Sequence, residues 1–325
     1  MDSLFKYTGL LPLSYFDEPN IKLSVLTHLN DPFENITSEN IFTSIRHSLQ
    51  GKTSTDDLLE RGIEGCRNGI DTILKLHGIV SFSETPRNSL MWAHYANQHQ
   101  GICIGYKTDL FSSIPNSDIN DPFSITIKEP QKINYDNLRF EEDHSFDIAY
   151  PQISKQAVIK HLMRKSDEWI YEKEHRCILP YSSASKLLIS NDKATIDVVT
   201  LPEVTQMKEY LGKPFNIIVK KLVKSKNLTK TEKKNIYNIK HTDSLDIISV
   251  ALQTSKDAFF LVDIDPSSIH SIYFGCKVDI NTIQKYYNAL KDKYKIYKFE
   301  VSRKRFELIS RLVTEETFSN KDKSV

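Results

Sequence analysis

The chain of 325 residues contains little cysteine, glycine and proline, and it carries almost no net charge. Ten glycines and twelve prolines exclude a collagen-like or low-complexity chain. A formal net charge of +1 excludes a global field strong enough to make nucleic acid the default partner. The four cysteines lie far apart and form no C-x-x-C pair, which argues against a zinc knuckle and indicates reduced, mostly buried thiols.

Long apolar segments and the common cofactor motifs are also missing. No stretch reaches the roughly 18 apolar residues that a transmembrane helix needs. The N-terminal residues have no basic region, and Pro12 and Ser14 interrupt their apolar run, so we expect a cytoplasmic protein with no membrane partner. The absence of G-x-G-x-x-G, G-x-x-x-x-G-K-[ST], H-E-x-x-H and G-x-S-x-G excludes Rossmann, P-loop, zincin and α/β-hydrolase sites.

Helical and strand patterns are mixed along the chain. Apolar spacing predicts a helical region over 39–77, with breaks at Gly51, Gly62 and Gly65. It also predicts helices from Asn88 or Ser89 to His99, over 153–165 and over 280–290. Strands are predicted over 21–26, 78–83, 102–106, 125–135, 169–179, 258–275 (two strands around a turn) and 294–301. Because no regular βαβ repeat appears, the sequence predicts an α+β fold.

Residues 185–257 interrupt this rhythm. Between Lys220 and Lys240 there are eight lysines and a single acidic residue, Glu232. We interpret 185–257 as a lysine-rich insertion, part helical, on a core formed by 1–184 and 258–325. A lysine-rich segment is either a solvated face or a contact for phosphate backbone, since lysine supplies charge without reading bases.

An unusual polar segment is Trp169 to Arg176. On a strand, Glu172, Glu174 and Arg176 point to the same side. Two close carboxylates repel, which raises at least one pKa unless the arginine compensates. Such a pair suits a site that stabilises positive charge at an anomeric carbon during glycosidic bond cleavage. The alternative is a surface strand with exposed ion pairs.

Three further segments have residues that are open to two interpretations. Met91, His94 and Tyr95 share a helix face, either as core packing with Trp92 or as an aromatic wall for a flat heterocycle. The serines of Ser81-Phe82-Ser83-Glu84 are suited to bonding a ribose or to capping the next segment of the chain. Lys6-Tyr7-Thr8 and the Asn30–Glu34 turn complete the set, and Asp31 with Glu34 is weak evidence for a metal.

Taken together, these segments resemble a bacterial domain-of-unknown-function family, number twenty-nine seventy-one, whose members are found in anti-phage and toxin–antitoxin loci. The resemblance rests on segments 6–7, 30–34, 81–84, 91–96 and 171–176, together with Ile-x-x-Ile-Tyr-Phe-Gly at 269–275. It covers residues 4–182 and roughly 258–310. It implies a toxin of a defence system, held by an antitoxin protein.

A more remote resemblance is to the ADP-ribosyltransferase fold, which binds NAD in a cleft of a split β-sheet without a Rossmann motif. It implies that Lys6 and Tyr7 stand in the first motif and Ser81, Phe82 and Ser83 in the second. It further implies that Glu174 holds the ribose and stabilises the cation, while Glu172 steers the attacking group. The resemblance places Tyr95 or Phe82 against nicotinamide. With His94, these residues form the predicted NAD site, and no metal is expected.

The sequence therefore predicts an ADP-ribosyltransferase that moves ADP-ribose from NAD to a macromolecule, with RNA or DNA favoured over protein because of Lys220–Lys240. One alternative is a metal-dependent nuclease using Asp31, Glu34, Glu84, Glu172 and Glu174. Another is a non-enzymatic adaptor of a defence operon, with a nucleotide in its aromatic cleft.

Overall fold

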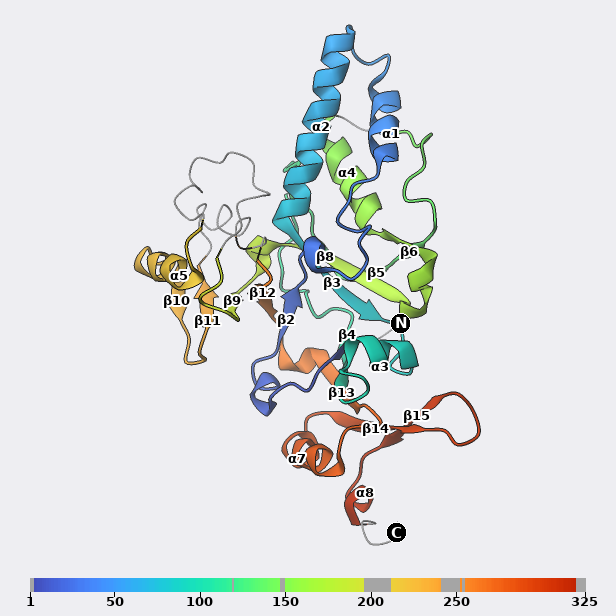
Figure 1. Ribbon diagram of the computed structural model, residues 1–325, viewed down its shortest axis with the longest axis vertical. Helices are drawn as coiled ribbons and strands as arrows, with labels where there is room; N and C mark the ends of the chain where they lie inside the picture. The colour runs from blue at the N-terminus through green and yellow to red at the C-terminus, as the bar shows by residue number, and fades with distance from the viewer. Residues whose placement is uncertain are drawn as a thin grey trace.

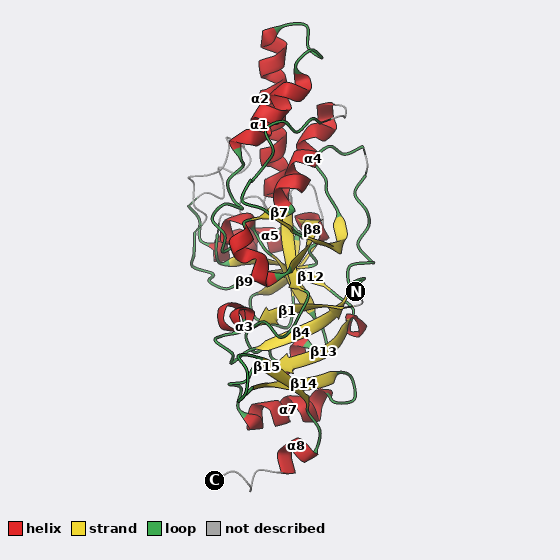
Figure 2. Cartoon of the chain, turned by 90° about the vertical axis from the view of Figure 1, so that its right-hand side faces the viewer, coloured by secondary structure: helices red, strands yellow, loops and turns green. Residues whose placement is uncertain are grey.

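Two sheets form the centre of the molecule, and a group of helices covers one end (Figures 1 and 2). The computed structural model describes residues 3–118, 120–146, 150–195, 212–240, 252 and 255–319. The larger sheet has the strand order β15-β14-β13-β4-β1-β3-β8-β5. Its strands are β1 (Ser3–Thr8), β3 (His77–Ser83), β4 (Ile102–Lys107), β5 (Ile127–Lys132), β8 (Glu174–Pro180), β13 (Ile269–Phe274), β14 (Lys295–Val301) and β15 (Leu308–Leu312).

The smaller sheet has the order β10-β11-β9-β12-β2 and packs against one face of the larger sheet. Its strands are β2 (Asn20–Leu23), β9 (Lys186–Ile189), β10 (Leu228–Lys230), β11 (Ile236–Ile239) and β12 (Ala258–Asp263). One apolar cluster joins the sheets, with Leu4, Ile104 and Tyr106 from the larger sheet and Leu187 and Phe260 from the smaller. A further short pair consists of β6 (Asn134–Tyr135) and β7 (Arg164–Lys165).

The helices cover the ends of both sheets. They are α1 (Glu39–Leu49), α2 (Asp56–Leu76), α3 (Ser89–Tyr95), α4 (Tyr150–Leu162), α5 (Phe215–Lys224), α7 (Ile280–Leu290) and α8 (Glu316–Ser319). Helices α1, α2 and α4 gather at the upper end in Figure 1, over β3 and β8. No helix in the described part of the chain is long and apolar enough to cross a membrane.

Helix α2 shows how the apolar spacing overrides isolated glycines. Its buried residues Leu59, Ile63, Ile70 and Ile73 recur at helical spacing and pack against Ile79 and Ile178 of the sheet. The helix therefore runs through Gly62 and Gly65, and the predicted breaks there are wrong. The break at Gly51 is confirmed, since that residue has φ = +80° between α1 and α2.

Most of the remaining predicted elements are confirmed, and the mixture of helices with mainly antiparallel strands confirms the α+β class. Asn88 caps α3, but this helix ends at Tyr95 rather than His99. Residues 97–99 all have positive φ, between 46° and 72°, and form a left-handed turn that a right-handed helix cannot enter. The 125–135 strand is divided into β5 and β6, and β15 was not predicted.

Of the predicted insertion 185–257, residues 196–211, 241–251 and 253–254 lie outside the described part of the chain. The described part contains β9, α5, β10 and β11. Strand β9 pairs with β12, and β12 pairs with β2, so these strands share a sheet with two strands that the sequence analysis assigned to the core.

Candidate functional site

A cavity opens where β1 and β3 diverge. The register joins these strands at a single pair, Phe5 with Ser83, whereas β1 and β4 are paired along six positions. The resulting cavity has a volume of about 210 Å³. Eight of the nine predicted site residues line it: Lys6, Tyr7, Ser81, Phe82, Ser83, Tyr95, Glu172 and Glu174. Residues from four separate segments of the sequence are thus brought together around one cavity.

The two strands that diverge are linked by side chains at the cavity. The ammonium group of Lys6 donates to the carbonyl of Ser81 at 2.9 Å, and burial lowers its pKa to about 8. The hydroxyl of Ser83 donates to the carbonyl of Glu172 at 2.7 Å. The hydroxyl of Tyr7 donates to the carbonyl of Thr85 at 2.7 Å. The bonds from Lys6 and Tyr7 join β1 to β3 and to the residues that follow it, and the bond from Ser83 joins β3 to the segment that carries the acidic residues.

The acidic segment does not form the continuous strand predicted over 169–179. Residues Asp167–Glu172 form a short 3-10 helix, and Lys173 has a left-handed φ of 46° before β8 begins at Glu174. Glu172 and Glu174 converge because of this turn, not through strand alternation. Both are buried, at 4% and 2% exposure, so the interpretation as exposed surface ion pairs is wrong.

Two buried cations lie between three buried carboxylates. The ammonium nitrogen of Lys165 is 2.7 Å from Glu172 Oε2, 3.3 Å from Glu174 Oε2 and 3.8 Å from Glu34 Oε1. Arg176 donates from Nε to Glu174 Oε1 at 2.6 Å and from Nη2 to Glu174 Oε2 at 3.0 Å, and it also pairs with Glu34. We call these five residues the carboxylate–cation cluster; its formal charge is −1.

The cluster sets the ionisation of its members. Burial alone would raise the pKa of Glu174, but the adjacent charges of Arg176 and Lys165 outweigh it and lower that pKa to about 2. Burial raises the pKa of Glu34, and its cationic neighbours only partly oppose this. Burial would lower the pKa of Lys165, but Glu174, Glu34 and Glu172 raise it. Glu174 is therefore a buried carboxylate that stays ionised at neutral pH.

The aromatic residues of helix α3 lie in different surroundings. Trp92 is fully buried against Tyr7 and Phe299, so the core interpretation is confirmed for that residue. Tyr95 instead lines the cavity and donates to Glu172 Oε1 at 2.5 Å. His94 is exposed and does not line the cavity. The alternative of a core histidine is therefore wrong, and His94 is the one predicted NAD-site residue that the structure does not bring to this cavity.

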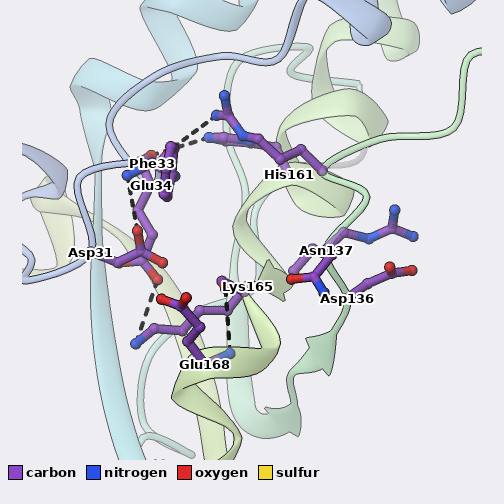
Figure 3. A pocket seen from close by; sticks show the side chains of 11 residues that line it. Asp31, Phe33, Glu34, Asp136, Asn137, His161, Lys165 and Glu168 are labelled. Carbon is purple, nitrogen blue, oxygen red and sulfur yellow. Dashed lines mark hydrogen bonds and ion pairs between the residues drawn. The ribbon is translucent and has the colours of Figure 1, made fainter.

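A second cavity, of about 310 Å³, adjoins the first (Figure 3). Glu34 and Lys165 line both cavities, so the cluster forms part of the wall between them. The other residues that line the second cavity are Asp31, Phe33, Asp136, Asn137, Arg139, His161, Arg164, Ser166 and Glu168. The 30–34 turn lies at the boundary, because Asn30 faces the first cavity and Asp31 the second.

The carboxylates named for a nuclease do not form one set. Glu34, Glu172 and Glu174 converge, but protein cations occupy the space between them. Glu84 pairs with Lys132 at 3.2 Å and lines neither cavity. Within the described residues, no group of three or more His, Cys, Asp and Glu is arranged to hold a metal ion.

Sequence reasoning missed Lys165 as a site residue. It treated Lys165 as the last residue of an amphipathic helix, while the structure ends α4 at Leu162 and starts β7 at Arg164. A lysine at a helix end is an ordinary surface residue, so no local signal pointed to it. Glu34 was named only as a weak metal ligand, and Asn30, which donates to the Tyr95 hydroxyl at 3.2 Å, only as part of a turn.

Comparison with known protein families finds a similarity in the central part of the chain. Residues 91–177 match the model of the family described as "Protein of unknown function (DUF2971)". The first family resemblance is thereby confirmed over a segment that includes Tyr95, Lys165, Glu172 and Glu174. No curated protein matches the chain, and no solved structure matches it.

Proposed function

We propose that this protein is an ADP-ribosyltransferase that uses NAD as donor, with the chemistry located in the cavity between β1 and β3. The observation that carries the proposal is Glu174, a buried carboxylate whose pKa is lowered to about 2 beside a cavity with two serines and aromatic rings. A fixed negative charge in a site of low polarity stabilises a developing cation far better than one in water. The divergence of β1 and β3 supports the proposed ADP-ribosyltransferase-like split sheet.

The volume limits which part of NAD enters. At about 210 Å³ the cavity is smaller than the usual pocket for a drug-sized ligand. It therefore takes the nicotinamide riboside end, and the adenylate end lies outside it. Phe82 and Tyr95 supply the ring surfaces for nicotinamide, and Ser81 supplies a hydroxyl for the ribose. The Ser83 hydroxyl, which donates to the Glu172 carbonyl, can contribute its oxygen as an acceptor only.

The reaction breaks the bond between the ribose anomeric carbon and the nicotinamide nitrogen. The bonding electrons leave with nicotinamide, which departs as a neutral molecule, and the positive charge passes to the ribose carbon. Glu174 stabilises that charge, and an acceptor hydroxyl or amine then attacks the carbon. In this proposal Glu172, already oriented by Tyr95 and Lys165, steers the acceptor and takes its proton.

The proposal is tested with NAD labelled in the adenylate phosphate, incubated with cell lysate, RNA or DNA in separate reactions. Wild-type protein is expected to release nicotinamide and to label one macromolecular fraction. Glu174→Gln is expected to lose about 10²- to 10³-fold in rate, the size found when one preorganised transition-state group is removed. Glu60→Gln, in an exposed pair with Arg46 on α1 and α2, is the matched control and retains activity.

Thermal unfolding of both variants separates loss of chemistry from loss of fold. Absence of nicotinamide release in every mixture contradicts the proposal, as does full transfer by Glu174→Gln. NAD binding without turnover would favour the nucleotide-binding adaptor. Growth arrest by the wild type and not by Glu174→Gln would support the toxin role, for which an antitoxin partner is expected.

The nucleic-acid acceptor is proposed from the lysines between Lys220 and Lys240. All eight are exposed on α5, β10, β11 and their connections. One of them, Lys233, pairs with Glu18 at 3.2 Å. Exposed lysines bind phosphate backbone by releasing counterions, without selecting a sequence.

A further inference from the structure

A row of aromatic rings extends from the cavity across one face of the larger sheet. Strand pairing puts Phe5, Tyr273 and Tyr297 on the same face, because Phe5 and Ser271 are both opposite Gly105, and Tyr273 is opposite Tyr297. The ring centroids of Phe5 and Tyr273 are 5.8 Å apart, and those of Tyr273 and Tyr297 are 4.7 Å apart. All three rings are half-buried. We call them the aromatic face.

The aromatic face is continuous with the cavity. Phe5 lines the cavity and pairs with Ser83, which in turn pairs with Glu174 of β8. The proposed catalytic carboxylate and the aromatic row therefore belong to one side of the same sheet. Gly105 lies between Phe5 and the β13 strand, and a Cβ there would be 2.7 Å from the ring of His270.

Strand β14, which carries Tyr297, continues past the buried Phe299 to the loop between β14 and β15, residues 302–307. Arg303, Lys304, Arg305 and Phe306 are all exposed, and Phe306 is completely uncovered at 114%. The loop extends away from the body at the lower right of Figure 1. Three cations beside a bare aromatic ring form a surface that can pair with phosphates and stack on a base at the same time.

The strands around the aromatic face carry mainly positive charge, although the carboxylate–cation cluster lies on the same side of the sheet and Glu307 is exposed in the loop. Strands β1, β4, β13, β14 and β15, all within the described part of the chain, contain one acidic residue, Glu300. It lies on the opposite face, 3.5 Å from Arg311. Lys107 and Lys295 are exposed at the edge of the aromatic face. The face thus complements a polyanion that has flat rings.

We propose that a single-stranded nucleic acid binds along the 302–307 loop and the aromatic face, with its end or a looped-out nucleotide reaching the cavity. Stacking on aromatic rings needs unpaired bases, so this surface selects single strands over duplexes. The role of the strand as acceptor rests on the proposed ADP-ribosyl transfer. The binding itself does not, and it is distinct from the lysine segment 220–240.

Fluorescence anisotropy with 20-nucleotide single-stranded DNA, single-stranded RNA and duplex DNA tests this surface, in the absence of NAD. Phe306→Ala removes a ring that packs against nothing, so its fold is retained, and it is expected to weaken single-strand binding about tenfold. Combined alanine substitutions at Arg303, Lys304 and Arg305 are expected to make the slope of log affinity against log salt shallower by about 2. Each lost phosphate contact accounts for ~0.7 of this change.

The matched control replaces Lys52, Arg61 and Lys285 with alanine, which removes the same charge from exposed positions outside the loop, the aromatic face and the lysine segment. Unchanged affinity in that control, with loss in both loop variants, supports the proposal. Unchanged binding in the loop variants overturns it, and so does equal affinity for duplex. A third outcome also overturns the proposal: the chain binds no nucleic acid but self-associates, and Phe306→Ala abolishes the self-association. That result would assign the surface to a second copy of the chain. Nicotinamide release, measured separately, reports on the proposed function alone.

Discussion

The buried carboxylate–cation cluster predicts an acid-dependent loss of stability that can be assigned to one residue. Adjacent cations lower the pKa of Glu174 from 4.5 to about 2. This difference corresponds to ~3 kcal/mol of folding free energy. Glu174→Gln removes the charge and keeps the shape, which leaves Arg176 and Lys165 with less compensation. Breaking a buried ion pair costs roughly 3–5 kcal/mol, so the two estimates agree.

The sign of the pH dependence follows from the direction of the shift. A carboxylate whose pKa is lower in the folded protein stabilises the fold above its unfolded pKa, and this contribution is lost as the pH falls toward 2. At low pH the protonated Glu174 resembles the glutamine, so the stabilities of wild type and variant converge. Between about pH 6 and pH 3 their difference is expected to shrink by ~2 kcal/mol. Burial raises the pKa of Glu34, so its contribution to stability changes with pH in the opposite direction, in the wild type and in the variant alike.

Chemical denaturation at a series of pH values, followed by circular dichroism, measures this difference directly. Glu60→Gln is again the control, since Glu60 is exposed and its ion pair with Arg46 is solvent-screened, and its curve should follow the wild type. Parallel curves for wild type and Glu174→Gln over the whole range would refute the reasoning. They would show that Glu174 is not held ionised by the cluster, and the proposed stabilisation of a ribosyl cation would lose its basis.

Two further predictions concern the segments that position the site. Gly275→Ala places a Cβ 2.1 Å from the carbonyl oxygen of His99 and is expected to destabilise the fold by about 1–3 kcal/mol. The control is Gly9→Ala, which is expected to be near neutral because nothing lies within 4 Å of its Cβ. Thermal unfolding compares the two variants, and equal stabilities would contradict the packing. Asn88 caps α3 through Leu90 and donates to the carbonyl of Tyr171 at 2.5 Å. Asn88→Ala should cost roughly 1 kcal/mol or more, since it removes both the cap and the donor to Tyr171. Asn88→Ser should cost less, since serine keeps a capping oxygen; denaturant midpoints that rank the two variants in reverse would contradict this assignment.

Local patterns predicted the elements better than they predicted the contacts between them. The 280–290 helix and the strands at 78–83 and 102–106 are confirmed because their apolar residues have clear helical or strand periods. The 3-10 helix at Asp167–Glu172 was missed because its aromatic and β-branched residues, Trp169, Ile170 and Tyr171, favour a strand. The left-handed turn at 97–99 was missed because none of its residues is glycine, the usual marker of positive φ.

Site residues could be predicted where the reactive side chains are close together in the sequence, on one element. They could not be predicted where the chain brings in a partner from a distant segment. Glu172 and Glu174 stand out because two acids near an arginine are unusual in an otherwise apolar stretch. Lys165 does not stand out, since only the return of the chain through β7 carries its ammonium group under both acids. His94 illustrates the converse, because it belongs to a sequence motif with Tyr95 and yet lies outside the cavity.

The same long-range pairing explains why cavity and aromatic face belong together. Strand β3 pairs with β1 at one position and with β8 at seven. Ser83 is opposite Phe5 on one side and opposite Glu174 on the other, so Glu174 lies on the same face of the sheet as Phe5. A longer β1–β3 ladder would close the space between Lys6 and Ser81 and leave no room for a ligand. The short ladder therefore has two consequences. It opens the cavity, and it leaves the acidic cluster in line with the rings and cations of β13, β14 and the 302–307 loop.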